Sequence, residues 1–408
     1  MEYINGGVCA AKGFRAAGVH AGVKVGGDPN KKDLAMILSD AECTAAAMYT
    51  TNRVKAAPIY VTMAHLEDEC AWGVIANSGN ANACAPNSHE NALKMCEAAA
   101  KATGRSARDF LVSSTGVIGP ELNVQAIVDA APALAAALTS DAEGSDAAAQ
   151  AIMTTDTVKK EVAVQVELGG KVVTLGGIAK GSGMIHPNMG TMLCFLTSDC
   201  AISPEMLSTV LHEVVPRTFN RVTVDGDTST NDTCAILCNA LAGNELIEWK
   251  DSSYAAFKAA LTEVLTYLSR AMAGDGEGAS RLITCTVRGS RSEEAAERLS
   301  KAVVSSSLVK AAMFGADANW GRVLCAMGYS KAPFRPEHVD IKFASVAGEL
   351  PVCHQGAQIP FDEDKAKEIL SQDEVIIDVN VNEGSDWATC WGCDLTYDYV
   401  KINGDYRT

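Results

Sequence analysis

Basic residues and long apolar runs are both scarce in this sequence, and each shortage excludes a class of partner. Lysine and arginine number 34 against 50 aspartate and glutamate residues among 408, which gives a formal net charge of −16. Because so acidic a surface repels nucleic-acid phosphates and anionic lipids, we expect neither nucleic acid nor a membrane as partner. The longest apolar stretches, such as residues 130–138, are far shorter than the ~20 residues that cross a bilayer.

Sequence signals for export, disulfide frameworks and metal sites are absent as well. Residues 1–7 contain no basic region followed by an apolar run, so we expect no secretory signal. The 14 cysteines are scattered without a repeating spacing, which is typical of buried thiols in a reducing compartment, and we expect a cytoplasmic protein. No second C-x-x-C pairs with Cys390–Cys393, and the seven histidines lack ligand spacing, so we predict no metal site.

The composition is that of a globular chain with two or three packed units. Hydrophobic residues make up 48% and charged residues 21%, and we find no internal repeat or low-complexity linker. Short strands, hairpins and helices are mixed along the chain, which predicts an α+β fold with sheets covered by helices. The predicted helices span residues 88–103, 124–139, 145–153, 203–216, 252–273, 293–306 and 320–328. The predicted strands span residues 72–76, 111–114, 161–166, 171–175, 192–196, 282–288, 339–343, 375–381 and 387–397.

Two glycine-rich loops do not fit a nucleotide site. Residues 176–183 contain the order Lys180-Gly181-Ser182, whereas a phosphate loop needs Gly-Lys-Ser/Thr followed by a helix. Residues 274–278 lie between a helix and a strand, the reverse of the dinucleotide fingerprint. This second loop fits a helix cap, and its two acids among three glycines also suit recognition of an amine.

The segment from Lys180 to Leu193 is the strongest candidate for chemistry. A threonine hydroxyl has no strong base of its own, but breaking the Gly190–Thr191 bond would expose an α-amine on the same residue. That amine, with an ordinary pKa of ~7.7–8, can accept the hydroxyl proton and make Thr191 a nucleophile. From the residues alone, a tight turn leading into a strand is the simpler interpretation.

Several blocks of the sequence resemble the ornithine acetyltransferase family of arginine biosynthesis. The resemblance spans the chain, and the matching blocks are residues 113–119 (SSTGVIG), 153–157 (MTTDT), 177–185 (GIAKGSGMI), 187–189 with 191–193, 274–280 (GDGEGAS) and 402–408 (INGDYRT). The residue before the nucleophile is usually alanine in that family and is Gly190 here. The difference bears on the rate of self-cleavage, because a more flexible backbone stores less strain.

The resemblance implies a self-cleaving glutamate N-acetyltransferase with a layered αββα fold. Cleavage between Gly190 and Thr191 would give fragments 1–190 and 191–408, with residues 191–289 completing the catalytic core and 290–408 forming a carboxy-terminal subdomain. Acetyl would pass from N2-acetylornithine to Thr191 and then to glutamate, releasing ornithine and N-acetylglutamate. The expected assembly is a heterotetramer of two fragments of each kind. No cofactor is expected, and acetyl-CoA remains open as a second acetyl donor.

The resemblance also implies roles for individual residues. Thr115 and Gly116 would stabilise the oxyanion, and losing one such donor typically costs about 10²–10³ in rate. The substrate-binding residues it implies are Thr154, Lys180, Thr191, Glu277, Asn403 and Thr408. By charge, we expect Lys180 to hold a substrate carboxylate and Glu277 the side-chain ammonium of ornithine.

Two other functions fit parts of the same pattern. An N-terminal-nucleophile hydrolase or aminopeptidase could use the same cut and the same threonine, with water as acceptor. A non-catalytic oligomeric binding protein would keep an intact chain.

Overall fold

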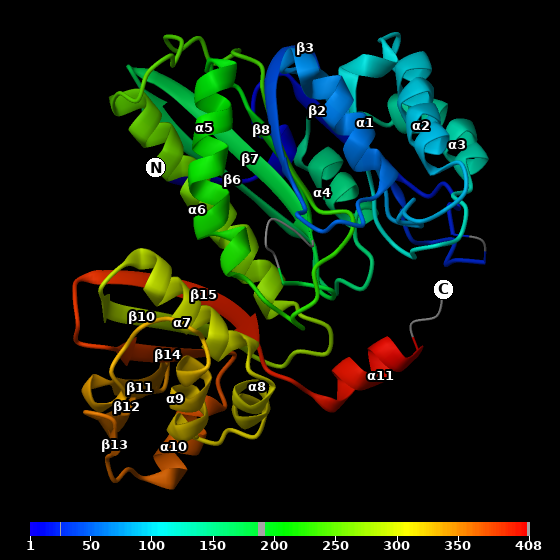
Figure 1. The fold of residues 1–408 in the computed structure, drawn as a ribbon. Coiled ribbons are helices and arrows are strands. Elements are labelled where there is room, and N and C mark those ends of the chain that lie inside the picture. Colours follow the sequence, from blue (N-terminus) through cyan, green and yellow to red (C-terminus); the bar gives the residue numbers. More distant parts are fainter. Residues whose placement is uncertain (25, 187–191, 406–408) are drawn as a thin grey trace.

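The computed structural model describes residues 1–24, 26–186 and 192–405. Gly190, Thr191 and Thr408, three residues with predicted roles, lie outside the described residues. The described chain forms two sheet-based units (Figure 1), the first reaching to the end of the long helix α6 and the second following it.

The first unit is built on a nine-stranded sheet. Its strand order is β1-β6-β7-β8-β9-β3-β4-β5, and β2 pairs with β3 off this path. The strands are β1 (Glu2–Ile4), β2 (Phe14–Val19), β3 (Leu34–Tyr49), β4 (Cys70–Asn77), β5 (Phe110–Ser114), β6 (Lys160–Leu168), β7 (Lys171–Lys180), β8 (Leu193–Ser198) and β9 (Thr233–Cys238). β7 runs antiparallel to β8, whereas β8 and β9 are parallel and start side by side.

The long strand β3 joins two halves of this sheet. Its first part pairs with β2 and β4, and its last part pairs with β9. Ile37 of one half and Phe195 of the other belong to one buried cluster, so the two halves pack against each other. Because side chains alternate along a strand, Met36 and Leu196 point to the outer faces instead.

Helices cover both outer faces and complete an αββα layering (Figure 1). The helices are α1 (Ala57–His65), α2 (Ser88–Thr103), α3 (Val124–Ala136), α4 (Ala142–Ala151), α5 (Pro204–Val214) and α6 (Ser252–Gly274). α5 and α6 share a core with β6 to β9, and α1 to α3 share another with β3 to β5. α4 packs on the inner cluster between the sheet halves. The predicted α+β class is confirmed.

The second unit is a six-stranded sheet of order β13-β12-β11-β14-β10-β15. Its strands are β10 (Leu282–Ser290), β11 (Asp340–Ser345), β12 (Gly348–His354), β13 (Ala357–Gln358), β14 (Glu374–Asn380) and β15 (Asp386–Cys393). Its helices are α7 (Glu293–Ser305), α8 (Ser307–Phe314), α9 (Trp320–Gly328) and α10 (Glu363–Leu370), which share one core with the sheet. The sheet thus starts at Leu282, ahead of residue 290, where the predicted subdomain begins.

The last helix, α11 (Tyr397–Asp405), leaves the second unit and returns toward the first (Figure 1). None of its described residues is buried. Two hydrogen bonds attach it, from Tyr399 Oη to Asp225 and from the Asn403 amide to Glu277. The predicted strand 387–397 is wrong beyond Cys393, because the chain turns there.

Local sequence signals account for several element boundaries. α2 has the predicted bounds; its N-cap is Asn87, and it ends at Gly104, whose φ of +71° favours glycine. Gly169 and Gly170, both with positive φ, form the turn between β6 and β7. Within the described ranges, no helix combines the length and the apolar character that crossing a membrane requires. The same ranges contain no group of three or more His, Cys, Asp or Glu side chains arranged to hold a metal.

Candidate active site

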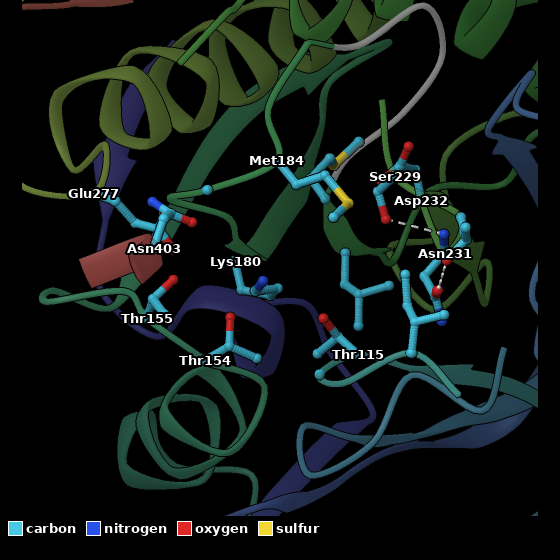
Figure 2. A pocket seen from close by; sticks show the side chains of 16 residues that line it. Thr115, Thr154, Thr155, Lys180, Met184, Ser229, Asn231, Asp232, Glu277 and Asn403 are labelled. Carbon is cyan, nitrogen blue, oxygen red and sulfur yellow. Dashed lines mark hydrogen bonds between the residues drawn. The ribbon is translucent and has the colours of Figure 1, made fainter. Parts of the chain in front are cut away.

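A cavity of about 130 Å³ opens where β5 and β7 end and β8 and β9 begin. Its lining residues are Thr115, Gly116, Ile118, Thr154, Thr155, Lys180, Gly183, Met184, Met192, Leu193, Ser229, Thr230, Asn231, Asp232, Glu277 and Asn403. Figure 2 shows Glu277 and Asn403 on one side, and Ser229, Asn231 and Asp232 on the other. Lys180 and Thr115 lie between these two groups (Figure 2). The cavity therefore has an acidic residue on each side, Glu277 and Asp232, and the basic Lys180 between them.

Thr115 and Gly116 form the wall that follows β5. The Thr115 N–H donates to the Asn77 carbonyl, which continues the pairing of β4 with β5. Gly116 has φ of +130°, and a Cβ there would lie 2.9 Å from the Asn80 nitrogen. Only glycine fits this close approach without strain.

Lys180, the last residue of β7, rests above a buried ion cluster. Its Nζ lies 4.0 Å from Asp156 Oδ2, and Asp156 Oδ1 accepts from Lys160 Nζ at 2.7 Å. Lys160 also donates to Asp275 at 2.5 Å, and its side chain has no solvent exposure. Asp156 in addition accepts from the Gly181 N–H at 2.7 Å. The cluster holds the strand end that presents Lys180 to the cavity.

The charges in this cluster shift one another's protonation. Burial acts to raise the pKa of Asp156, but the positive charges of Lys180 and Lys160 outweigh it and lower the pKa to about 2. Burial lowers the pKa of Lys180, and the Asp156 carboxylate opposes that effect. Asp156 therefore stays ionised at neutral pH and gives Lys180 a fixed counter-charge.

The depressed pKa of Asp156 predicts a loss of stability in acid. Because the folded value of about 2 lies below the ordinary 3.8, Asp156 stabilises the fold above pH 3.8, and this contribution disappears as the pH falls through about 2. We expect the free energy of unfolding, measured in urea, to depend less on pH in this window for Asp156→Asn than for wild type. Asp129→Asn, at an exposed position of α3, is the control. Equal slopes for wild type and Asp156→Asn would contradict the assignment.

Glu277 and Asn403 form the opposite side of the cavity. The Asn403 amide donates to Glu277 Oε2 at 2.7 Å, and the Glu277 N–H donates to the Ser182 carbonyl. The Glu277 carboxylate lies directly against Gly183, where a Cβ would come within 2.3 Å of it. Asn403 of α11 thus contacts the carboxylate of Glu277, which lies in the loop after α6. A carboxylate in this position suits the binding of an ammonium group.

Thr154 and Thr155 occupy the floor between Lys180 and Glu277 (Figure 2). The Thr154 N–H donates to Asp156 Oδ2 at 3.1 Å, so the buried ion cluster also fixes this loop. The Thr155 hydroxyl forms a hydrogen bond with the Ser182 hydroxyl at 2.7 Å. Of the two threonines on this floor, Thr154 is therefore the better candidate for binding substrate with its side chain.

The segment before β9 supplies residues that the sequence analysis did not predict. Asn231 donates to the carbonyls of Ala81 and Ser114, at 2.6 and 2.8 Å, and so fixes the chain immediately before Thr115. Asp232 is 2% exposed and is preceded by Ser229 and Thr230 in the cavity wall. The only sequence signal was a polar run directly ahead of the apolar strand β9.

The structure brings most of the predicted site residues to one cavity. They are Thr115, Gly116, Thr154, Lys180, Glu277 and Asn403. Gly190, Thr191 and Thr408 lie outside the described residues, but Met192, bonded to Thr191 in the chain, lines the same cavity. The catalytic and binding roles of all these residues remain predictions.

Comparison with known proteins gives consistent matches over the whole chain. Residues 15–408 match the model of the ArgJ family. The arginine biosynthesis bifunctional protein ArgJ of Symbiobacterium thermophilum is 48% identical over 409 residues, covering 100% of both chains. ArgJ 1 of Clostridium acetobutylicum is 47% identical over 397 residues, covering 97% of this chain and 96% of its own.

Two solved structures are also similar in sequence. The arginine biosynthesis bifunctional protein argJ from Bacillus halodurans is 41% identical, covers 52% of this chain and 97% of its own, and has a TM-score of 0.49. The ornithine acetyltransferase from Mycobacterium tuberculosis, complexed with ornithine, is 36% identical, covers 46% of this chain and 98% of its own, and has a TM-score of 0.41.

Proposed function

The chain belongs to the ArgJ family of arginine-biosynthesis acyltransferases, and we propose that it transfers acetyl from N2-acetylornithine to glutamate through an acetyl-Thr191 intermediate. The observation that carries this proposal is the charge arrangement of the cavity. Lys180 supplies a cation for a substrate carboxylate, and Glu277 supplies a carboxylate for an ammonium. An acetylated amino acid with a basic side chain matches both.

The nucleophile in this proposal is made by cleavage of the chain between Gly190 and Thr191. Met192 lines the cavity at the start of β8, which supports placing the reacting residue at this wall. The freed α-amine of Thr191 takes the hydroxyl proton while the oxygen attacks the acetyl carbon. Ornithine leaves, and the amine of glutamate then removes the acetyl group from Thr191. Each step has a lower barrier than direct transfer between two amines.

Both half-reactions pass through a tetrahedral oxyanion, which needs donors that are already in place. Thr115 and Gly116 serve this purpose in the proposal, since their loop is held from two sides. Asn77 accepts from the Thr115 N–H, and Asn231 ties the residue before Thr115 to the start of β9. A fixed loop loses little free energy to reorganisation when the oxyanion forms.

The proposal extends to the state of the protein in the cell. We expect a cytoplasmic enzyme that assembles from two fragments 1–190 and two fragments 191–408, without a cofactor. All 14 cysteines are free thiols, which is compatible with a reducing compartment. Acetyl-CoA is a candidate second donor, in keeping with the word bifunctional in the names of the relatives.

Product analysis tests the proposed transfer. With N2-acetylornithine and glutamate, the wild-type protein should form N-acetylglutamate faster than free acetate, because the amine competes with water for acetyl-Thr191. Mass spectrometry of the mixture measures both products. Acetate as the main product would identify a hydrolase, and one uncut band on a denaturing gel without any turnover would favour a binding protein. Replacing N2-acetylornithine with acetyl-CoA in the same assay tests the second donor.

A further inference from the structure

Asp232 is a buried carboxyl group in the cavity wall to which the proposed mechanism gives no role. It is 2% exposed, and its Oδ2 atom has no hydrogen-bond partner among the described residues. The other acids near the cavity are engaged: Glu277 accepts from Asn403, and Asp156 accepts from Lys160. An unpartnered buried oxygen costs free energy, so its position calls for a ligand or a function.

The strand register places Asp232 beside the start of β8. Thr233 pairs with Leu193, and the Thr233 N–H donates to the Met192 carbonyl at 3.0 Å. Asp232 precedes Thr233 as Met192 precedes Leu193, so Asp232 lies at the end of the sheet where β8 begins.

The surroundings favour the neutral, protonated form of Asp232. Burial raises the pKa of this carboxyl well above its ordinary value, while the Thr50 hydroxyl, the Met192 N–H and the charge of Lys180 act in the opposite direction. The positive charge of Lys180 acts on Asp232, and burial lowers the pKa of Lys180 as well. A neutral carboxylic acid can donate a proton, which an ionised one cannot.

The proposed reaction needs such a donor. When the C–N bond of an acetylated amine breaks, nitrogen cannot leave as an anion and must gain a proton. The Thr191 amine already holds the proton taken from its own hydroxyl, and that proton is needed again when the oxygen is released. A second donor would let both half-reactions proceed without exchange of protons with water.

We propose that Asp232 is this second donor, a general acid that protonates the leaving amine and a general base toward the incoming one; the inference rests on the acetyl transfer proposed above. In the first half-reaction the Thr191 oxygen bonds to the acetyl carbon, the C–N bond breaks, and nitrogen takes the proton from Asp232. In the second, the glutamate nitrogen bonds to the acetyl carbon and gives its proton to the Asp232 carboxylate. The Thr191 oxygen then leaves with the proton held by its amine, so every group returns to its starting state.

The test compares two acetyl donors that differ in their need for an acid. N2-acetylornithine expels an amine, whereas p-nitrophenyl acetate expels a stable anion that needs no proton. Asp232→Asn should lower kcat/KM for N2-acetylornithine by about 10²–10⁴, the usual range for general acid catalysis, while acylation by the ester stays close to wild type. The burst of p-nitrophenolate counts the acylable sites, so incomplete self-cleavage does not distort the comparison.

Asp199→Asn is the matched control. Asp199 is equally buried and follows β8 at the other end of the strand, where it accepts from the backbone N–H groups of Thr174 and Lys12. Burial raises its pKa as well, so the control makes the same chemical change away from the cavity. It should leave the ratio of the two rates unchanged.

A pH profile provides a second measurement that does not need the ester. The wild-type kcat/KM for N2-acetylornithine should rise as the Thr191 amine loses its proton and fall at higher pH as Asp232 loses its own. Asp232→Asn should lack the descending limb. If the limb persists, another group is the acid and the inference is wrong. The inference is also wrong if the variant loses activity equally with both acetyl donors, or with neither.

The outcomes separate this inference from the proposed function. Failure of the wild type to form N-acetylglutamate would overturn the function, whereas normal transfer with an unaltered ratio in Asp232→Asn would overturn only the role of Asp232. If Asp232→Asn stays uncut, the two donors are compared by pH profile on the wild type alone. A descending limb with N2-acetylornithine but not with p-nitrophenyl acetate then supports Asp232 as the general acid. Identical descending limbs with the two acetyl donors exclude this role.

Discussion

Replacing Thr191 with alanine should leave one intact chain and remove acetyl transfer. The substitution deletes the hydroxyl that, in the proposed mechanism, attacks the Gly190 carbonyl and later the acetyl group, so neither bond should be broken. We expect the rate of transfer to fall by about 10⁶, the scale at which loss of a protease nucleophile lowers kcat. Intact mass spectrometry should find fragments 1–190 and 191–408 in the wild type and a single species in the variant.

Thr191→Ser is the matched control, because it keeps a hydroxyl and a potential α-amine at the same position. It should still be cut and should retain measurable transfer.

Gly190→Ala tests the rate of cleavage. Because alanine has less backbone freedom than glycine, this variant should store more strain before the nucleophile, and the cut fraction at early times should increase. A cut Thr191→Ala protein would refute the mechanism.

Replacing Lys160 with methionine should destabilise the first unit by about 3–5 kcal/mol, the range for removing one partner of a buried ion pair. Lys160 is fully buried and bonds to both Asp156 and Asp275, so its loss leaves two carboxylates without their shared cation. Urea unfolding followed by circular dichroism measures the change, and the Thr191→Ala background keeps the dissociation of fragments out of the transition.

Lys159→Met is the control at the neighbouring position. The Lys159 side chain is 42% exposed and pairs with Asp146 and Glu161 at the surface, so we expect a change of about 1 kcal/mol or less. Similar effects for the two substitutions would contradict the role given to the buried cluster. Because Asp156 also holds the Thr154 and Gly181 N–H groups, Lys160→Met should lower substrate affinity as well.

Local signals predicted many of the elements, because the groups involved are close in sequence, but β3, β9 and α1 were not predicted. Glycines end α2 and join β6 to β7, and their positive φ angles are a local property. The strand predicted for 387–397 was too long because Asp394 turns the chain by accepting from the Ser280 and Arg281 N–H groups. Both N–H groups are more than a hundred residues away in the sequence, so the local pattern around Asp394 does not indicate the turn.

The candidate site was predictable where the chemistry lies in a recognisable block. Lys180 and Glu277 were expected to serve one substrate, and they line one cavity. The supporting residues were not predictable in this way. Lys160 and Asp275 are 115 positions apart, and Asp232 ends a polar run that resembles an ordinary loop. Their importance comes from burial, which only the fold determines.

The position of β8 and β9 in the first sheet has a consequence for how the enzyme is made. Both strands follow residue 191, yet they stand between β7 and β3, which precede residue 190. In separate fragments, β7 and β3 of the first fragment and β8 and β9 of the second would therefore have unpaired edges. Such edges can pair with other chains and cause aggregation. Synthesis must continue past Cys238 before the sheet can close. The proposed cut would therefore be confined to folded protein, and we expect that producing the two fragments apart and mixing them is a poor route to active enzyme.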